Sequence, residues 1–345
     1  MRKIFMVSLF ISLIMMLSAC GEETSGSEGN EGGDTVSFRL ATPDPDTSPI
    51  TEAANEFANV VEEKSEGSIE ISVHPNGSLY GGDPSAAVKQ LGEGSLDMLA
   101  LSTSLYANFE PKFNAISIPY LFDDTDQFIS FLNSDLAGGL LTEIHDELGI
   151  KGIGYWSREF RQITNSAHPI TGPADLNGLQ LRVPNSPLWV EFFEGAGTVT
   201  TPMDFSEVYN ALQLGTIDGQ ENPLGVVVSS NMHEVQDYLT ISNHMAEAWV
   251  VGINDDQFSA LNEEQQQILE EATQEVQQWK VENDASNAES IIEEVTSQGM
   301  EVNELTPEQQ EEFVEISQEA YPAFKELIGD DEFFEQILEF AGKNE

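Results

Sequence analysis

The chain has 345 residues, and its 61 acidic residues against 13 lysines and arginines give a formal net charge of −48. Nucleic-acid binding requires a basic surface that neutralises phosphates, so this chain is not expected to bind DNA or RNA. With 40% apolar residues and 19 phenylalanines it has ample material for a buried core, which excludes a disordered acidic tail.

The N-terminal segment has the layout of a bacterial secretion signal. Basic residues at positions 2 and 3 precede an apolar run over residues 4–17, which is too short to cross a bilayer comfortably. The Leu-Ser-Ala-Cys sequence that follows ends at Cys20, the single cysteine, and resembles a bacterial lipobox. We expect a signal peptide over 1–19 and a membrane anchor on lipidated Cys20. The alternative is an ordinary signal peptide with an incidental cysteine.

Beyond the cysteine, the apolar pattern predicts a tether followed by an α/β body. Residues 20–34 are rich in Gly, Ser and acids, so we expect a flexible acidic tether. The pattern then alternates between the periods of strands and helices, which predicts α/β architecture with mostly parallel sheets. The expected strands are 36–41, 68–73, 97–101 and 152–156, and the expected helices are 49–66, 86–91 and 125–148.

The last third of the chain has a different pattern. Residues 262–295 and 306–340 are rich in Glu and Gln and have helical periodicity without intervening strands. We expect long helices packed on the α/β body. Their acidic faces are interpreted as solvated surface.

Arginine is scarce once the signal peptide is set aside. Four remain, Arg39, Arg158, Arg161 and Arg182, and three of them fall within residues 158–182. A guanidinium can donate two parallel hydrogen bonds to a carboxylate, which makes a carboxylate clamp one interpretation. The other is an ordinary surface ion pair, which we favour for Arg158 because Glu159 follows it. Spacing alone leaves both interpretations open for the other two arginines of this window.

No cofactor or metal motif is found. The five histidines never have the spacing of a zinc site, and no complete Gly-x-Gly-x-x-Gly or P-loop occurs. Carboxylates are so frequent that an acid–base pair of a hydrolase can be neither argued for nor excluded. We therefore expect no metal and no cofactor.

The most distinctive segment is TPMDFSEVYNALQLGTIDGQENP, residues 201–223. Asp204 followed by Glu207 predicts a capping box at the start of a helix that ends at Gly215. Residues 217–223 are interpreted as a polar turn, unusually rich in side chains that form hydrogen bonds.

This segment closely resembles the extracytoplasmic solute-binding proteins of TRAP transporters, which include receptors for C4-dicarboxylates and sialic acid. Further matches follow in order at residues 74–79, 94–98, 160–165, 175–184 and 239–244, so the resemblance covers the chain from about residue 36 onward. It implies a two-lobed, periplasmic-binding-protein-like (Venus flytrap) α/β fold with a long connecting helix. Lobe I is expected over 35–158 plus 248–287, and lobe II over 159–247 plus 288–345.

The resemblance also implies roles for individual residues. Arg182 would form a bidentate pair with the ligand carboxylate, and Arg161 would add a second cationic contact. Asn222 would hydrogen-bond the carboxylate, while Phe205 would lie against the ligand. Ser102 stands where sialic acid receptors carry an acidic residue, so sialic acid is not the expected ligand. Weaker candidates for the distal end of the pocket are Thr42, Ser102 and Trp249.

We therefore expect a lipid-anchored receptor, not an enzyme, that captures a small organic acid anion such as a C4-dicarboxylate. It would close about a hinge and deliver its ligand to the small and large membrane subunits of a TRAP permease. Its location would be a Gram-positive surface or the periplasmic side of a membrane. The alternatives are an ABC-type binding lipoprotein, a ligand-sensing lipoprotein and a surface hydrolase.

The high negative charge favours a salt-rich or alkaline habitat. A chain with so many acids repels itself and repels anionic ligands at long range. At 1 M salt the screening length falls to about 3 Å, which removes most of this repulsion.

Overall fold

The computed structural model describes residues 35–344, so the expected signal peptide, tether and lipidated Cys20 lie outside the described residues. The strands are β1 (Val36–Ala41), β2 (Ile69–His74), β3 (Met98–Ser102), β4 (Ile150–Ser157), β5 (Gln162–Asn165), β6 (Gln180–Val183), β7 (Val199–Pro202), β8 (Gly219–Asn222), β9 (Tyr238–Ile241), β10 (Ala248–Asn254) and β11 (Glu301–Glu304). The α-helices are α1 (Pro49–Lys64), α2 (Pro84–Gly92), α3 (Thr103–Tyr106), α4 (Thr125–Leu132), α5 (Asp135–Leu148), α6 (Pro187–Gly195), α7 (Phe205–Gln213), α8 (Leu224–Ser229), α9 (Asp255–Ser259), α10 (Glu263–Ser297), α11 (Pro307–Glu319), α12 (Tyr321–Ile328) and α13 (Asp331–Phe340). Three 3-10 helices complete the set: η1 (Pro111–Ser117), η2 (Pro173–Leu176) and η3 (Met232–Glu234).

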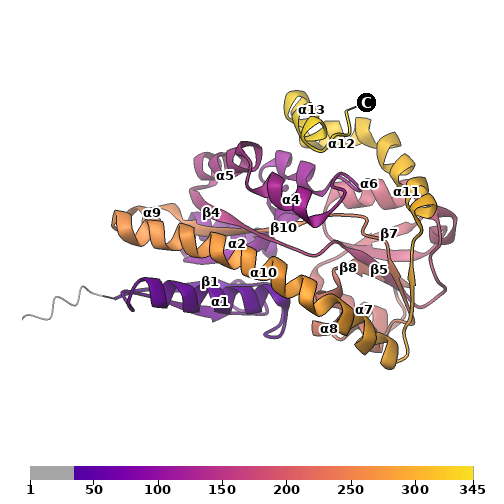
Figure 1. Cartoon of the computed structure of the whole chain (residues 1–345), viewed down its shortest axis with the longest axis horizontal. Coiled ribbons are helices and arrows are strands. Elements are labelled where there is room, and N and C mark those ends of the chain that lie inside the picture. The colour runs from indigo at the N-terminus through magenta and orange to yellow at the C-terminus, as the bar shows by residue number, and fades with distance from the viewer. Residues whose placement is uncertain (1–34, 345) are drawn as a thin grey trace, which may run out of the picture. The chain divides into compact units, whose positions relative to one another are not determined.

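Two sheets organise these elements (Figure 1). The first has the order β2-β1-β3-β10-β4 and the second the order β11-β9-β5-β8-β6-β7. In the first, β10 is antiparallel to both of its neighbours, and in the second β5 is antiparallel to both of its own. The expectation of mostly parallel sheets agrees with the pairings, since β1–β2, β1–β3, β9–β11, β6–β7 and β6–β8 are parallel, but each sheet contains one strand that runs against the others. In the first sheet this strand is β10, through which the chain returns after it has built most of the second sheet.

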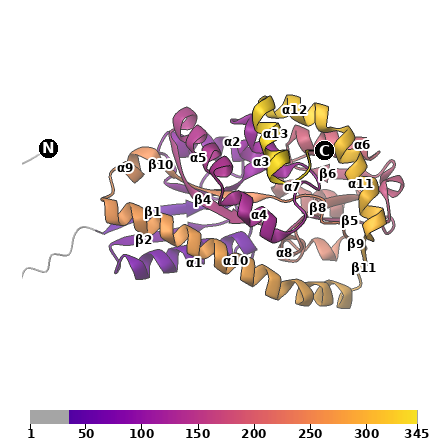
Figure 2. The ribbon, with the colours of Figure 1, turned by 45° about the horizontal axis from the view of Figure 1, so that its top comes forward.

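The strands of the first sheet fall within 36–157 and 248–254, and those of the second within 162–241 and 301–304. The long helix α10 lies against elements of both the first-sheet and the second-sheet segments of the chain. It packs against α1 and β4, and farther along against α8 and β11 (Figure 2). A Cβ on Gly154 of β4 would lie 2.8 Å from the Thr273 side chain of α10, so glycine permits this close contact. The lobe boundaries given above stay a prediction.

Two segments expected as single helices are divided. Residues 125–148 form α4 and α5, because the Ser134 hydroxyl accepts a hydrogen bond from the Ala137 amide and starts a new helix. Residues 306–340 form α11, α12 and α13. Pro322 lies in the first turn of α12, and Gly329, with φ of 71°, ends it in the left-handed conformation.

The C-terminal helices pack on η1, which belongs to the segment that builds the first sheet, and on α6, which lies between strands of the second. Helix α12 contacts η1 and α6, and the Ser317 hydroxyl of α11 donates to the Pro119 carbonyl at 2.7 Å. The Phe313 ring stacks on Tyr120 with centroids 6.3 Å apart. These contacts extend one apolar core from η1 through α6 to the C-terminal helices.

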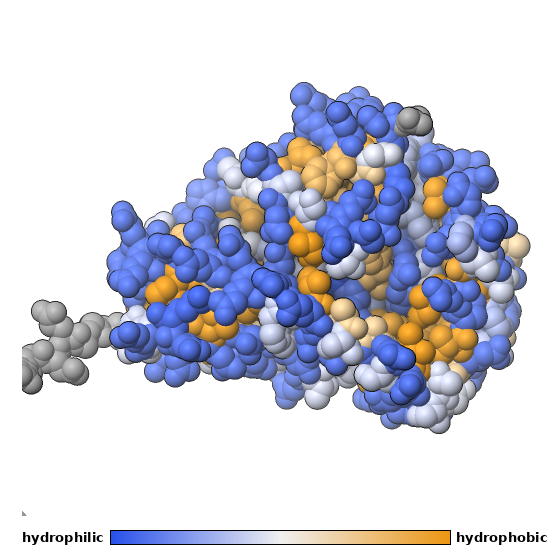
Figure 3. All heavy atoms as spheres, in the orientation of Figure 1, coloured by the Kyte–Doolittle hydropathy of each residue, from blue (hydrophilic) through white to orange (hydrophobic). Residues whose placement is uncertain are grey.

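Within residues 35–344, no helix combines the length and the apolar character that a membrane span requires. Helix α10 is long, but its sequence is dominated by polar and acidic residues. On the face shown in Figure 3, hydrophilic side chains predominate and hydrophobic ones form separate patches.

Candidate ligand site

A cavity of about 90 Å³ lies where the ends of strands from both sheets meet. Strands β3 and β10 of the first sheet and strands β6 and β8 of the second contribute to its wall. The structure thus brings most of the candidates together, although they are far apart in the sequence. The singled-out residues that line the cavity are Ser102, Arg158, Arg161, Arg182, Phe205, Asn222 and Trp249.

Arg182 has the side chain best suited to bind an anion. It is buried, and its Nε and Nη2 atoms donate to the Met203 carbonyl at 3.1 and 2.8 Å. Within the described part of the chain, Nη1 has no hydrogen-bond partner and no carboxylate lies within 4.0 Å of this guanidinium. Burial lowers the Arg182 pKa to about 10, so the group stays charged at neutral pH. The Nη1–Nη2 edge is therefore available to a carboxylate, and the Phe205 ring lies 6.0 Å from the guanidinium carbon.

Arg161, in contrast, is neutralised by acids of the protein. It donates through Nε and Nη2 to the Glu221 carboxylate, and through Nη1 to Glu247 at 2.7 Å. Burial alone would lower the Arg161 pKa, but these two carboxylates raise it above its ordinary value. Its Nη2 also donates to the Asn222 Oδ1 at 3.2 Å. Arg161 lines the cavity, but most of its donors are already satisfied.

The interpretation of Arg158 as a surface ion pair with Glu159 is wrong. Arg158 is buried, donates to the Glu247 carboxylate, and lies 4.5 Å from the Trp249 ring. Glu159 instead accepts from the Gly225 amide at 3.1 Å. Arg158 and Glu159 are adjacent in sequence but do not form an ion pair with each other.

Two buried carboxylates escaped the sequence analysis because acids are so abundant. Burial would raise the Glu221 pKa, but Arg161 and His244 hold it at about 2. Burial also opposes ionisation of Glu247, yet Arg158 and Arg161 keep its pKa below the ordinary value. The hydroxyls of Ser102 and Ser104 donate to Glu247 as well. Ser102 therefore lines the cavity with its hydroxyl already engaged.

The segment expected as a polar turn is a strand. Residues 219–222 form β8, a central strand of the second sheet, and all four are buried. Their polar side chains are paired: Gln220 donates to Thr164 at 2.9 Å, and Asn222 donates to Gln220 at 2.6 Å. The expected capping box is also absent, because Asp204 precedes α7 without a side-chain cap and instead accepts from Asn185 at 2.7 Å.

The structure does not bring Thr42 to the cavity wall. Its hydroxyl pairs with the Thr51 hydroxyl at 2.9 Å, behind the end of β1. The following residues, Pro43 and Asp44, line the cavity instead, together with Tyr80. No signal in the sequence distinguished this aspartate or this tyrosine from the many others.

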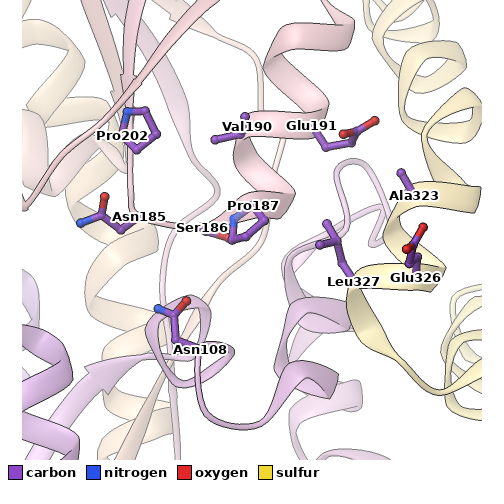
Figure 4. Close-up of a pocket in the computed structure, with 10 residues that line it drawn as sticks. All are labelled: Asn108, Asn185, Ser186, Pro187, Val190, Glu191, Pro202, Ala323, Glu326 and Leu327. Carbon is purple, nitrogen blue, oxygen red and sulfur yellow. The ribbon is translucent and has the colours of Figure 1, made fainter.

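A wider hollow of about 860 Å³ opens beside α6 and α12 (Figure 4). Its charged lining residues are Glu191 and Glu326, which oppose the binding of an anion. Among residues 35–344, no group of three or more His, Cys, Asp or Glu side chains is placed to hold a metal ion. The smaller cavity with the arginines is therefore the candidate site.

Comparison with known proteins agrees with this geometry. The profile of the DctP family, described as "Bacterial extracellular solute-binding protein, family 7", matches residues 40–327. The chain belongs to this family. The C4-dicarboxylate-binding protein DctB of Bacillus subtilis is 30% identical to this DctP-family protein over 310 residues, which are 89% of this chain and 87% of DctB.

Two solved structures of the family have the same fold. The sugar acid binding protein DctPAm of Advenella mimigardefordensis, in complex with galactonate, has a TM-score of 0.84 and 30% identity, covering 90% of this chain and 99% of its own. A TRAP periplasmic solute binding protein of Sulfurospirillum deleyianum with bound succinate has a TM-score of 0.80 and 26% identity, covering 88% and 99%. The DctP-family protein is thus a two-lobed solute-binding protein of a transporter and not an enzyme. This membership decides against the surface hydrolase and the ABC-type receptor.

Proposed function

We propose that this protein captures a small organic acid anion, a C4-dicarboxylate or a related acid, outside the cytoplasm. It delivers the anion to the small and large membrane subunits of a TRAP permease. The observation that carries the proposal is the buried Arg182 guanidinium, which lines the cavity and has no acidic partner within the described residues. Burying a guanidinium without a counter-charge is unfavourable in free energy, and a bound ligand carboxylate would offset that penalty.

Binding proceeds by hinge closure. Both sheets contribute to the cavity, so a ligand contacts all of its partners only when the two sides come together around it. The lobes are those predicted from the sequence, 35–158 plus 248–287 and 159–247 plus 288–345. Closure is favoured by the difference in ligand affinity between the closed and open states.

Lipidation of Cys20 holds the receptor at the membrane through the acidic tether 20–34. A diacylated terminus with long chains provides a stable anchor, since each buried CH₂ contributes about 0.8 kcal/mol. Cys20→Ser should move the protein from the membrane fraction to the medium or periplasm, and mass spectrometry should show that the acyl mass is lost. Equal membrane retention of both forms would exclude the lipid anchor.

Thermal denaturation in 1 M salt, with a panel of organic acids, tests the receptor function. A ligand at 1,000 times its Kd stabilises the fold by about 4 kcal/mol, which shifts the midpoint by several degrees. A selective shift by a few carboxylates supports the proposal. A folded sample that no acid stabilises contradicts it. Binding without acid uptake by cells that carry the permease would favour a ligand-sensing lipoprotein.

A further inference from the structure

Three acids line the cavity, and Asp44 is the one among them whose carboxylate has no hydrogen-bond partner in the described structure, since Asp204 accepts from Asn185 and Glu247 from Arg158. Asp44 is only 5% exposed and lies in the loop that follows β1. Within residues 35–344, no group donates a hydrogen bond to its carboxylate, and no basic nitrogen lies within 4.0 Å of it. Buried acceptors are normally satisfied, so this carboxylate is placed to receive a donor from a ligand.

Tyr80 offers the complementary group on the same side of the cavity. Its hydroxyl is buried and has no hydrogen-bond partner among the described residues. Two backbone hydrogen bonds of 2.9 Å, Asn76 to Asp44 and Gly77 to Thr42, hold its loop against the loop of Asp44. Gly77 has φ of 61°, and a Cβ there would lie 3.1 Å from the Tyr80 ring, so glycine allows the ring this position. An acceptor and a donor on adjoining loops are the pair that a ligand hydroxyl satisfies.

The charges around the cavity disfavour a second carboxylate on the ligand. Arg161 is neutralised by Glu221 and Glu247. Arg158 is paired with Glu247 and is also the cation that most stabilises the Asp44 carboxylate. A second ligand carboxylate near Arg158 would be repelled by Asp44 and Glu247, which both already interact with that guanidinium. Arg182 alone among these arginines has no carboxylate partner in the described structure.

We propose that Asp44 and Tyr80 bind hydroxyl groups of the ligand, so that the pocket selects a hydroxylated monocarboxylic acid of the sugar-acid type over a C4-dicarboxylate. The ligand carboxylate pairs with Arg182, and its hydroxyls reach the Asp44–Tyr80 side. This assignment rests on the receptor function proposed above and narrows its ligand class.

Calorimetric titration of the purified protein at pH 7.5 tests the selection. Galactonate, erythronate and glycerate represent hydroxy monocarboxylates, whereas succinate and fumarate represent dicarboxylates. At least one hydroxy acid should bind more tightly than both dicarboxylates by roughly tenfold to a hundredfold, the loss expected when a buried acceptor finds no donor. A dicarboxylate that binds as tightly as the best hydroxy acid would overturn the assignment. Binding of no acid at all would instead contradict the receptor function itself.

Three variants locate the selectivity. Asp44→Asn should weaken hydroxy acids by about tenfold or more and bring dicarboxylates closer to them, because an NH2 donor replaces one acceptor oxygen and the negative charge is lost. Tyr80→Phe should weaken hydroxy acids and leave dicarboxylates unchanged. The matched control is Asp46→Asn, an exposed acid outside the cavity wall, which should change neither class. If Asp44→Asn and Tyr80→Phe, both shown by melting to be folded, left the ratio of affinities at the wild-type value, the assignment would be wrong.

Discussion

The Arg161 guanidinium and the Glu221 carboxylate form a buried ion pair that joins the residue preceding β5 to strand β8. Nη2 lies 2.8 Å from Oε1, and the same nitrogen donates to the Glu221 carbonyl at 2.9 Å. His244 also contacts this carboxylate, at 3.1 Å. Arg161 lines the cavity whereas Glu221 does not, so we assign the pair to supporting the site more than to binding the ligand.

Breaking this pair should be costly. Glu221→Gln leaves a buried guanidinium without its main counter-charge, and we expect a loss of about 3–5 kcal/mol in the free energy of unfolding. Urea denaturation measures this loss. The matched control is Glu270→Gln, which removes the half-exposed partner of Lys151 and should have no measurable effect. Equal effects of the two substitutions would refute the supporting role.

The stability should depend on pH with a maximum in mildly acidic solution. Burial raises the pKa of Asp44 to about 6 and that of Glu159 to about 7, so the folded state binds protons more tightly than the unfolded chain. The contribution of Asp44 and Glu159 to the free energy of unfolding is fully present below pH 4 and is lost as the pH rises through 6 to 7. Glu221, with a pKa of about 2, has the opposite effect, because its contribution is lost as the pH falls below 4.5 towards 2.

Urea denaturation at pH 2, 4 and 8 should therefore give the highest free energy of unfolding at pH 4. In the double variant Asp44→Asn, Glu159→Gln the free energy of unfolding should fall less between pH 4 and 8 than in the wild type, while the general change in negative charge with pH affects both alike. If the free energy of unfolding of the double variant fell with pH as it does in the wild type, the assignment to these two buried acids would be wrong.

Salt should stabilise the protein. Repulsion among 61 acidic residues is screened within about 3 Å at 1 M salt, so the midpoint of unfolding should rise by several degrees between dilute buffer and molar NaCl. Potassium chloride at the same ionic strength serves as the control for a specific ion effect. Equal midpoints in dilute and molar salt would argue against adaptation to a salt-rich habitat.

Ligand binding should make the protein more compact. If the lobes close around the acid, small-angle X-ray scattering should show a smaller radius of gyration with saturating ligand than without it. Arg182→Ala, measured at the same ligand concentration, is the control. A radius that stays constant although calorimetry shows saturation would exclude hinge closure.

The sequence predicted the long helix α10 better than it predicted the elements and ion pairs around the site. Helix α10 has a strong helical period and a capping box at Asn262, so its range was predicted closely. Strand β8 was missed because its polar residues look like a turn, and their burial depends on partners in β5 that are more than fifty residues away. Arg158 was misassigned for the same reason, since its partner Glu247 is distant in sequence but adjacent in space.

Two cavity-lining residues, Asp44 and Tyr80, could not be predicted from the sequence, for a physical reason. Asp44 and Tyr80 differ from other acids and tyrosines of the chain only in being buried without partners at the cavity, a property of the packed loops. Arg182 could be singled out because arginine is scarce in this sequence and because a family motif surrounds it.

The most direct measurement is a calorimetric titration of the wild type, Arg182→Lys and Arg182→Ala with the acid that gives the largest thermal shift. Loss of a buried, hydrogen-bonded charge pair should cost about 2–5 kcal/mol, a fall in affinity of more than about tenfold, while each variant remains folded. Arg39→Lys is the matched control, because Arg39 is half exposed and pairs with Asp97 at 2.8 Å, away from the cavity. An unchanged Kd in folded Arg182→Ala would contradict the carboxylate clamp.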